Sequence, residues 1–322
     1  MTQPQIVQQF QEVLQQHTAG DPMNDQIAWT DLTATDVVEK LAEQGTTVSA
    51  HVAEQLFETC GYGRRQAQKS TTMGEHPDRN AQFERIAELR DEYFDSPNPI
   101  VSLDTKKKEL LGNFYRDGRL FTREMLRVFD HDFRSHAEGV VIPHGIYDVK
   151  LNRGYLHLGT SRDTSEFACD CWEDWWLRFG RELYPRASSV LVLCDGGGSN
   201  SSRTHLFKSD LQAVVNRIGL PVRVAHYPPY CSKFNPIEHR LFPHVTRACQ
   251  GVVFRSLELV QELMAKTSTR TGLSVVVDIV DQVYEKGRKV TEVMKAGWNL
   301  VRDAFLPLWN YQILPAPAKN EN

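Results

Sequence analysis

Residues 190–200 read VLVLCDGGGSN, and this stretch decides the fold. Its first five residues are all apolar, which is typical of a strand that is buried on both faces of a sheet. The run stops at Asp195, and the three glycines after it indicate a loop whose backbone can approach a substrate closely. We therefore expect a central strand of an α/β domain, with Asp195 at its carboxyl end.

The sequence on either side predicts the same architecture. Further short apolar runs predict strands at 100–103, 140–142, 155–158 and 222–225. Apolar residues at helical spacing predict helices at 165–183, 206–218 and 236–249. Strands followed by an alternation of helix and strand are typical of an α/β fold with a mixed sheet flanked by helices.

Three acidic residues stand where such sheets build sites. Asp104 and Asp195 each end an apolar run, and Glu238 opens a helix after Asn235 and Pro236. Three converging carboxylates suit a hard cation such as Mg²⁺ or Mn²⁺, and two such ions support phosphoryl transfer. Each residue alone also fits a structural role, because a strand-end Asp forms turns and a first-turn Glu complements the helix dipole.

The glycine loop does not match the common phosphate or nucleophile motifs. It lacks the lysine of a P-loop, and Arg203 does not fill that position. The string GGGSNS does not fit G-x-G-x-x-G, and Ser201 stands where a nucleophile elbow needs glycine. These mismatches argue against a P-loop, a dinucleotide site and a serine hydrolase.

The N-terminal part predicts helices. Residues 1–30 read as a leader with a Gln-rich amphipathic helix, and residues 31–95 as a helix-turn-helix region with a linker. Thr33 and Asp36 resemble a capping box at the first of its two helices. Arg64, Arg65 and Lys69 follow the second helix, where basic side chains can hold phosphates. An ordinary helical hairpin followed by a solvated basic loop fits the same pattern.

Composition sets outer limits. The chain has 322 residues, 41% of them apolar, and a net charge of -4, which excludes disorder as its main state. No apolar stretch is long enough for a membrane span, and the first residues do not form a signal peptide. Residues 1–60 carry one basic and nine acidic side chains, so charge alone does not indicate a nucleic-acid binder. Six cysteines without a CxxC pair fit reduced thiols and a cytoplasmic protein.

Several strings resemble one family. PPYCSKFNPIEHRLF, CDGGGSNSSR, SLDTKKKELLGNF, GRKV and WNYQILP occur in the order and spacing of the Rhodopirellula-type (IS-Azo type) DDE transposases of bacterial insertion sequences. The similarity runs from about residue 21 to residue 315. It implies a ribonuclease-H-like mixed sheet flanked by helices over residues 96–270. A small all-α helix-turn-helix region would precede this sheet. A C-terminal extension at 271–322 would pack on the core. Its tryptophans would be buried there, although they would also suit stacking on bases.

The resemblance also implies the site. Asp104, Asp195 and Glu238 become the three catalytic acids, which hold two Mg²⁺ or Mn²⁺ ions for attack on a DNA phosphodiester without a covalent enzyme intermediate. Six further residues beside these acids become candidate DNA contacts: Lys106, Lys107, Lys108, Ser232, Lys233 and Asn235.

The family sets the expected partners and the alternatives. Members act on double-stranded DNA, at insertion-sequence ends and at a target, as possible homo-oligomers near the bacterial nucleoid. Relatives usually carry a further N-terminal helix-turn-helix, so we expect this chain to be shortened or to lack that module. A non-mobile DNA-binding remnant that regulates intact copies, and a metal-dependent phosphoesterase with another substrate, remain open beside the transposase.

Overall fold

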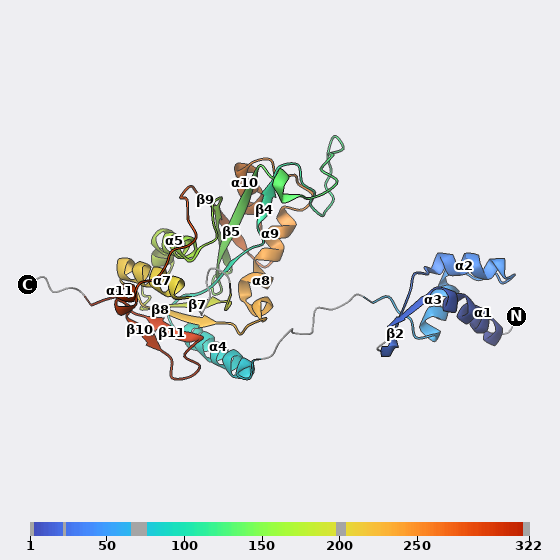
Figure 1. The fold of residues 1–322 in the computed structure, drawn as a ribbon, viewed down its shortest axis with the longest axis horizontal. Helices are drawn as coiled ribbons and strands as arrows, with labels where there is room; N and C mark the ends of the chain where they lie inside the picture. Colours follow the sequence, from blue (N-terminus) through green and yellow to red (C-terminus); the bar gives the residue numbers. More distant parts are fainter. Residues whose placement is uncertain (1–2, 22–23, 66–75, 198–203, 318–322) are drawn as a thin grey trace, which may run out of the picture. The chain divides into compact units, whose positions relative to one another are not determined.

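A computed structural model describes residues 3–21, 24–65, 76–197 and 204–317 (Figure 1). The chain forms two compact units, residues 1–70 and residues 71–322. Each unit is described by itself. Within the described residues, no helix is long and apolar enough to cross a membrane.

The described residues of the first unit form three helices and a β-hairpin. Its elements are α1 (Gln3–Gln16), β1 (Thr18–Asp21), β2 (Asn24–Thr30), α2 (Ala34–Glu43) and α3 (Ala50–Thr59). The predicted capping box at α2 is confirmed, because Thr33 accepts from the Asp36 N–H and the Asp36 carboxylate accepts from the Thr33 N–H. Ser49 caps α3 by a single bond, in which its hydroxyl accepts from the Val52 N–H.

Two expectations for this unit need correction. Helices α2 and α3 follow as predicted, but the antiparallel hairpin of β1 and β2 lies ahead of them, within residues 1–30, where only a helical leader was expected. Residues 1–30 are also not a separate leader, since Phe10 and Leu14 of α1 share one apolar core with Leu41 of α2 and Leu56 of α3. A 14-residue amphipathic helix is marginal in water alone, so burial of its apolar face against α2 and α3 explains why it belongs to the unit.

The second unit is built on a mixed sheet. Its strands are β3 (Ile100–Thr105), β4 (Glu109–Leu111), β5 (Gly139–Asp148), β6 (Arg153–Gly159), β7 (Val190–Cys194), β8 (Val222–His226), β9 (Ser274–Val280), β10 (Leu300–Arg302) and β11 (Asn310–Ile313). They lie in the order β10-β11-β8-β7-β3-β5-β6-β9, and β4 pairs with β5 outside this path. Strands β3, β7 and β8 are parallel, and β5 is antiparallel to β3. The segment β6-β5-β3-β7-β8 has the ribonuclease-H-like arrangement that the sequence predicts.

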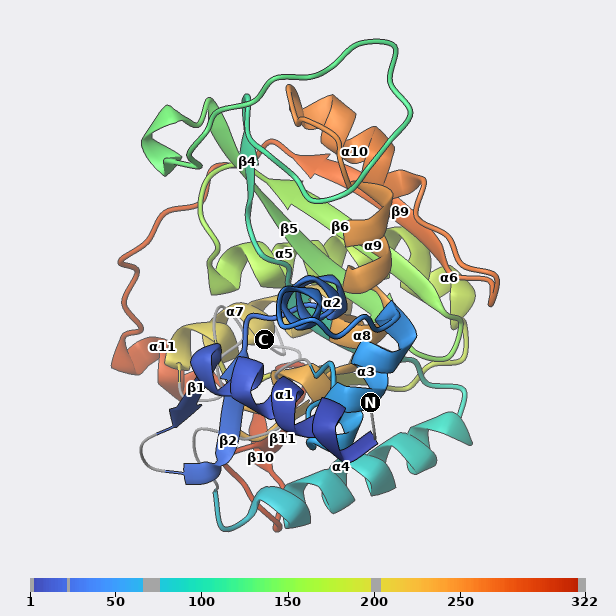
Figure 2. The ribbon, with the colours of Figure 1, turned by 90° about the vertical axis from the view of Figure 1, so that its right-hand side faces the viewer.

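Helices cover both faces of this sheet (Figures 1 and 2). One face packs against α4 (Arg79–Phe94), α8 (Pro236–Arg240), α9 (Phe242–Ala248) and α10 (Leu257–Ala265). The other face packs against α5 (Ser165–Trp175) and α7 (His205–Ile218). The remaining elements are η1 (Arg134–His136), the π-helical turn η2 (Trp176–Gly180), α6 (Arg181–Leu183), η4 (Ser232–Phe234) and α11 (Glu292–Ala296). The alternation of the strands is what separates these faces: Ile100 belongs to the first core and Val101 to the second.

The unit boundaries differ from the expected domains. Helix α4 lies in the second unit, with Ile86, Leu89 and Tyr93 in its core, whereas the sequence placed it with the helix-turn-helix region. Residues 271–322 do not merely pack on the core, because β9 extends the sheet beside β6, and β10 and β11 extend it beside β8. Short strands of mixed polarity become recognisable only through the neighbours with which they pair.

Candidate active site

The register of two parallel strands brings Asp104 and Asp195 together. Leu103 of β3 lies opposite Cys194 of β7, so the next residue on each strand is an aspartate at the same edge of the sheet. Side chains alternate along a strand, and Leu193 belongs to the core on the α8 side. Asp195, two residues further on, therefore faces α8, as Asp104 does.

Glu238 reaches this edge because α8 lies close to the sheet. Pro236 occupies the first turn of α8, and Glu238 follows two residues later. Gly145 lies opposite Asp104 on β5, and a Cβ atom there would stand 2.7 Å from Ile237 Cδ1 of α8. The sequence analysis missed Gly145, whose lack of a side chain permits this approach.

The three carboxylates repel one another. Burial raises the pKa of Asp104 to about 8, and the charges of Asp195 and Glu238 add to the effect. Burial also raises the pKa of Asp195, which the Gly197 N–H lowers and the charge of Glu238 raises. Three half-buried oxygen donors with excess negative charge are a suitable ligand set for a hard divalent cation. The predicted acids thus lie together, and their chemistry fits the expected ions.

One predicted DNA contact needs correction. Asn235 is fully buried, so it cannot reach a phosphate. Its Oδ1 accepts from the Ser102 hydroxyl at 2.5 Å, and its Nδ2 donates to the Leu103 carbonyl at 3.1 Å. The Ser102 hydroxyl also accepts from the Ile237 N–H at 3.0 Å. Asn235 therefore links α8 to β3. A polar residue inside the apolar run IVSLD was the available sequence signal for Ser102.

The other predicted DNA contacts have different surroundings. Lys106 is 8% exposed and forms an ion pair with Glu109, so it is not a free surface cation. Lys108 is half-buried and lies 3.8 Å from Asp163. Exposed positions are held by Lys107, Ser232, Lys233, Arg64 and Arg65. Lys69 and most of the glycine loop, from residue 198 to 203, lie outside the described residues.

The backbone of Asp195 is held by a buried histidine that the sequence analysis did not single out. His226 of β8 is fully buried, and this burial lowers its pKa to about 4. Its Nδ1 lies 3.0 Å from the Asp195 carbonyl, and its Nε2 lies 3.1 Å from the Tyr311 hydroxyl. A carbonyl only accepts, so Nδ1 carries the proton and Nε2 accepts from Tyr311.

We expect the substitution Tyr311→Phe to destabilise the protein. It leaves the buried His226 Nε2 without a donor, at a cost of about 1–3 kcal/mol. Urea unfolding measures the difference in the free energy of unfolding. The matched change Tyr284→Phe removes a hydroxyl that donates to the less buried Asp170, and we expect a smaller loss from it. Equal losses from both changes would contradict the assigned role of the His226 contact.

A cavity lies beside Glu238. Its volume is about 550 Å³, and its lining includes Glu238, Lys107, Tyr115, Thr246 and Gln250. Tyr115, Arg116 and Asp117 form part of its wall, and the Gly251 N–H holds this segment by donating to the Asp117 carbonyl. The cavity offers room for a polar substrate directly at Glu238.

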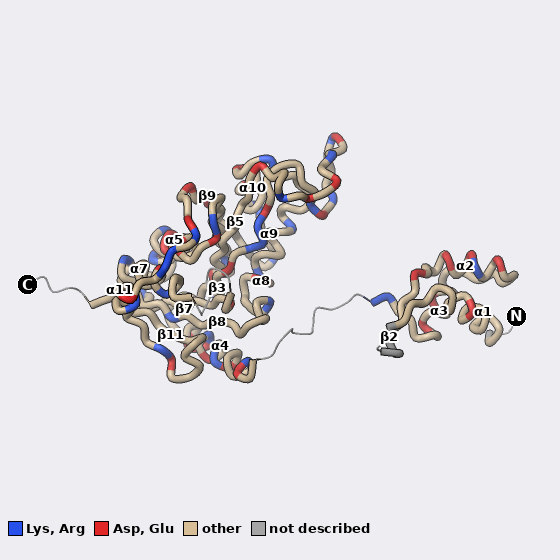
Figure 3. Tube along the Cα trace, viewed as in Figure 1, with Lys and Arg blue, Asp and Glu red and all other residues tan. Residues whose placement is uncertain are grey.

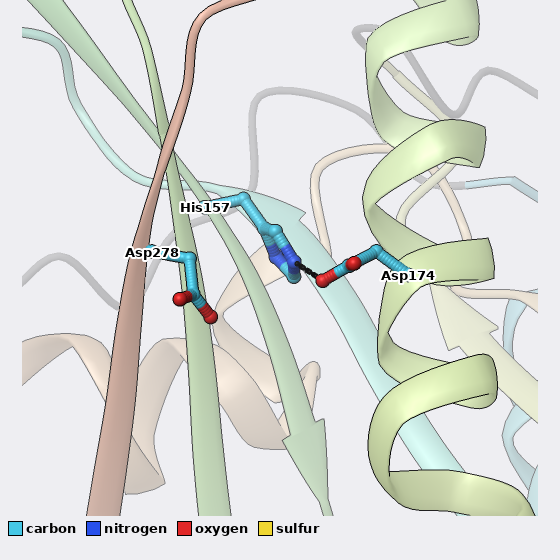
Figure 4. A group of neighbouring side chains, drawn as sticks. All are labelled: His157, Asp174 and Asp278. Carbon is cyan, nitrogen blue, oxygen red and sulfur yellow. Dashed lines mark hydrogen bonds and ion pairs between the residues drawn. The ribbon is translucent and has the colours of Figure 1, made fainter.

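A second cluster contains residue types that can bind a metal, but its side chains are held by ion pairs. Figure 4 shows His157 of β6, Asp174 of α5 and Asp278 of β9. The atoms that these residues could offer to a metal lie within 4.8 Å of one another. The Arg178 guanidinium donates to Asp174 at 3.0 Å and to Asp278 at 2.9 Å. Among the described residues His157 Nδ1 finds no hydrogen-bond partner, although a metal-ligating histidine usually donates its second ring nitrogen. This cluster is an ion-pair network that joins β6 and the edge strand β9 to α5.

Comparisons with known proteins place the chain. The family model for the Rhodopirellula transposase DDE domain matches residues 9–315. No curated protein matches the sequence. Among solved structures, the Mos1 transposase paired-end complex with left transposon end has 14% identity and a TM-score of 0.45, covering 80% of this chain and 68% of that one. The Mos1 mariner paired end complex with Mn has 14% identity and a TM-score of 0.42, covering 80% and 69%.

The family model spans nearly the whole chain, including the N-terminal helices and all three acids. The chain therefore belongs to the Rhodopirellula transposase DDE domain family.

Proposed function

We propose that this protein is a DDE transposase that cleaves DNA strands at insertion-sequence ends and transfers them to a target, with Mg²⁺ or Mn²⁺. The observation that carries the proposal is the convergence of Asp104, Asp195 and Glu238 at one sheet edge, where burial, together with the charges of the other two acids, raises the pKa of Asp104 to about 8. Such a trio is unfavourable by itself and becomes favourable when cations offset its charge.

Each carboxylate has a separate support. Asp104 is held by the pairing of β3, Asp195 by the contact of its carbonyl with His226, and Glu238 by the short helix α8. Two ions bound there would activate the attacking oxygen and stabilise the leaving oxygen of an in-line displacement. The chain's own residues supply the ligand set, the buried surroundings and the cavity beside Glu238 in which the DNA strand would lie.

The proposed partner is double-stranded DNA, which the first unit would recognise. Helices α2 and α3 carry acidic side chains, and Arg64 and Arg65 follow α3 (Figure 3). One of the similar solved structures is a Mos1 transposase paired-end complex with a transposon end. Pairing of two DNA ends would require at least two copies of the chain.

A cleavage assay tests the proposal. The substrate is a duplex that spans the two flanks of the gene encoding this protein, and the control duplex is a shuffled sequence of equal length. We expect Mn²⁺-dependent nicks at discrete positions in the first duplex only. Equal cleavage of both duplexes would favour a general phosphoesterase, and binding without cleavage would favour the DNA-binding remnant.

Neutralising the basic cluster after α3 tests the DNA-binding role. We expect the triple change of Arg64, Arg65 and Lys69 to glutamine to weaken binding and to reduce the slope of log K against log[salt] by about 2–3, because fewer counterions are released. Fluorescence anisotropy at several salt concentrations measures the slope.

The matched control changes two exposed arginines of the second unit, Arg181 and Arg186, to glutamine. They lie ahead of β7, and therefore away from the sheet edge that carries the acids. An unchanged slope in the triple variant would reject the phosphate role of the cluster.

A further inference from the structure

We propose that Ser102 is a positioning residue that sets the place of Glu238 relative to Asp104, acting through Asn235 and the start of α8. The inference rests on the proposed metal-dependent function and deepens it. Both Ser102 and Asn235 are fully buried, and their side chains bond to each other and to the backbone of Leu103 and Ile237. Any effect they have on the site must pass through the residues they hold.

The hydrogen bonds form a closed link between strand and helix. Ser102 lies two residues before Asp104, and Asn235 lies three residues before Glu238. The Ser102 hydroxyl donates to Asn235 Oδ1 at 2.5 Å and accepts from the Ile237 N–H at 3.0 Å. Asn235 Nδ2 closes the link by donating to the Leu103 carbonyl at 3.1 Å. Three hydrogen bonds thus connect the segment just before Asp104 to the segment just before Glu238.

The way in which α8 is capped shows that these hydrogen bonds connect the helix to the sheet. Asn235 occupies the N-cap position, where an asparagine usually accepts from its own helix. Its side chain makes no such bond and points to β3 instead. The Ile237 N–H that would remain free is satisfied by Ser102 of the strand. The first turn of α8 is thus capped by a side chain of the sheet instead of by its own N-cap residue. This fixes the start of α8 to β3, the strand that carries Asp104.

The need for such a link follows from the charges. Helix α8 has only five residues, too few to hold its own orientation. Its Glu238 faces two other carboxylates that repel it. Mg²⁺ requires nearly ideal octahedral geometry at about 2.0–2.1 Å, so a small displacement of one ligand weakens binding. Holding Glu238 in place before the cation arrives avoids that loss.

Calorimetric titration of Mn²⁺ into the full chain tests the role of Ser102. We expect Ser102→Ala to weaken Mn²⁺ binding by about tenfold, the range found when residues that orient metal ligands are removed. The conservative change Ser102→Thr keeps the hydroxyl, and we expect it to restore the affinity to within about threefold of the wild type. Restoration by a hydroxyl distinguishes positioning from a general loss of packing.

A second buried serine provides the matched control. Ser189 lies just before β7, and its hydroxyl bonds to the Tyr93 hydroxyl at 2.8 Å, away from the acids. We expect Ser189→Ala to leave Mn²⁺ affinity unchanged. If Ser189→Ala weakens binding as much as Ser102→Ala does, the effect is general destabilisation and the inference is overturned.

The remaining outcomes separate this inference from the proposed function. Wild-type affinity in Ser102→Ala, together with lost binding in Asp104→Asn, would overturn the role of Ser102 and leave the metal site intact. Unchanged binding in Asp104→Asn would overturn both. If Ser102→Ala does not fold, Ser102→Cys keeps the volume with a weaker donor. At least threefold weaker Mn²⁺ binding by that variant supports the link, and wild-type affinity overturns it.

Discussion

The substitution Asp195→Asn is expected to reduce DNA cleavage by at least about a thousandfold while DNA binding remains. Asparagine keeps the shape of the side chain but removes one of the three charges that would offset the cations. Each 1.4 kcal/mol of lost transition-state stabilisation slows a reaction about tenfold, and metal ions supply several kcal/mol of it. Single-turnover cleavage of the end-containing duplex in Mn²⁺ measures the loss, and anisotropy measures binding.

An exposed acid of the same unit provides the control. Asp91 lies on the solvent side of α4, so Asp91→Asn removes the same charge away from the sheet edge. We expect this variant to cleave DNA as the wild type does. Full cleavage by Asp195→Asn would contradict the assignment of the site, and loss of DNA binding in that variant would contradict the separation of binding from chemistry.

The second large effect concerns stability in the absence of metal. Asp104 has a folded-state pKa of about 8, above its ordinary value of 3.8, so the folded state holds a proton that the unfolded state releases between these pH values. The free energy of unfolding therefore falls as pH rises from about 4 to about 8. We expect Asp104→Asn to make this decline shallower.

The size of the effect follows from the same argument. One pKa unit corresponds to about 1.4 kcal/mol, and residual hydration of the half-buried carboxylates reduces the total. We expect Asp104→Asn to raise the free energy of unfolding by about 2 kcal/mol at pH 8 in EDTA, which corresponds to about 4–8 °C in Tm, and to change it little at pH 4. Scanning calorimetry at both pH values checks this. An equal gain at both pH values would show that ionisation of the buried Asp104 beside two other acids is not its cause, and we expect Mn²⁺ to stabilise only the wild type.

The sequence by itself determined the centre of the fold. The run Val190–Cys194 is apolar throughout, and only a strand covered on both faces buries all five side chains. Asp104 and Asp195 were recognisable because each ends such a run, and Glu238 because a proline marks the start of its helix. These signals lie within short stretches of the sequence, so they can be read without knowing which segments pack beside them.

Only the tertiary structure decided which polar residues face a substrate and which are buried in hydrogen bonds between a helix and the sheet. Asn235 lies in the same motif as Glu238, yet it is buried against Ser102, more than a hundred residues away in the chain. Gly145 and His226 likewise act through contacts between distant segments. The partner of a buried polar group lies elsewhere in the sequence, and folding alone brings the two together, because a buried group left unpaired costs more free energy than a paired one gains.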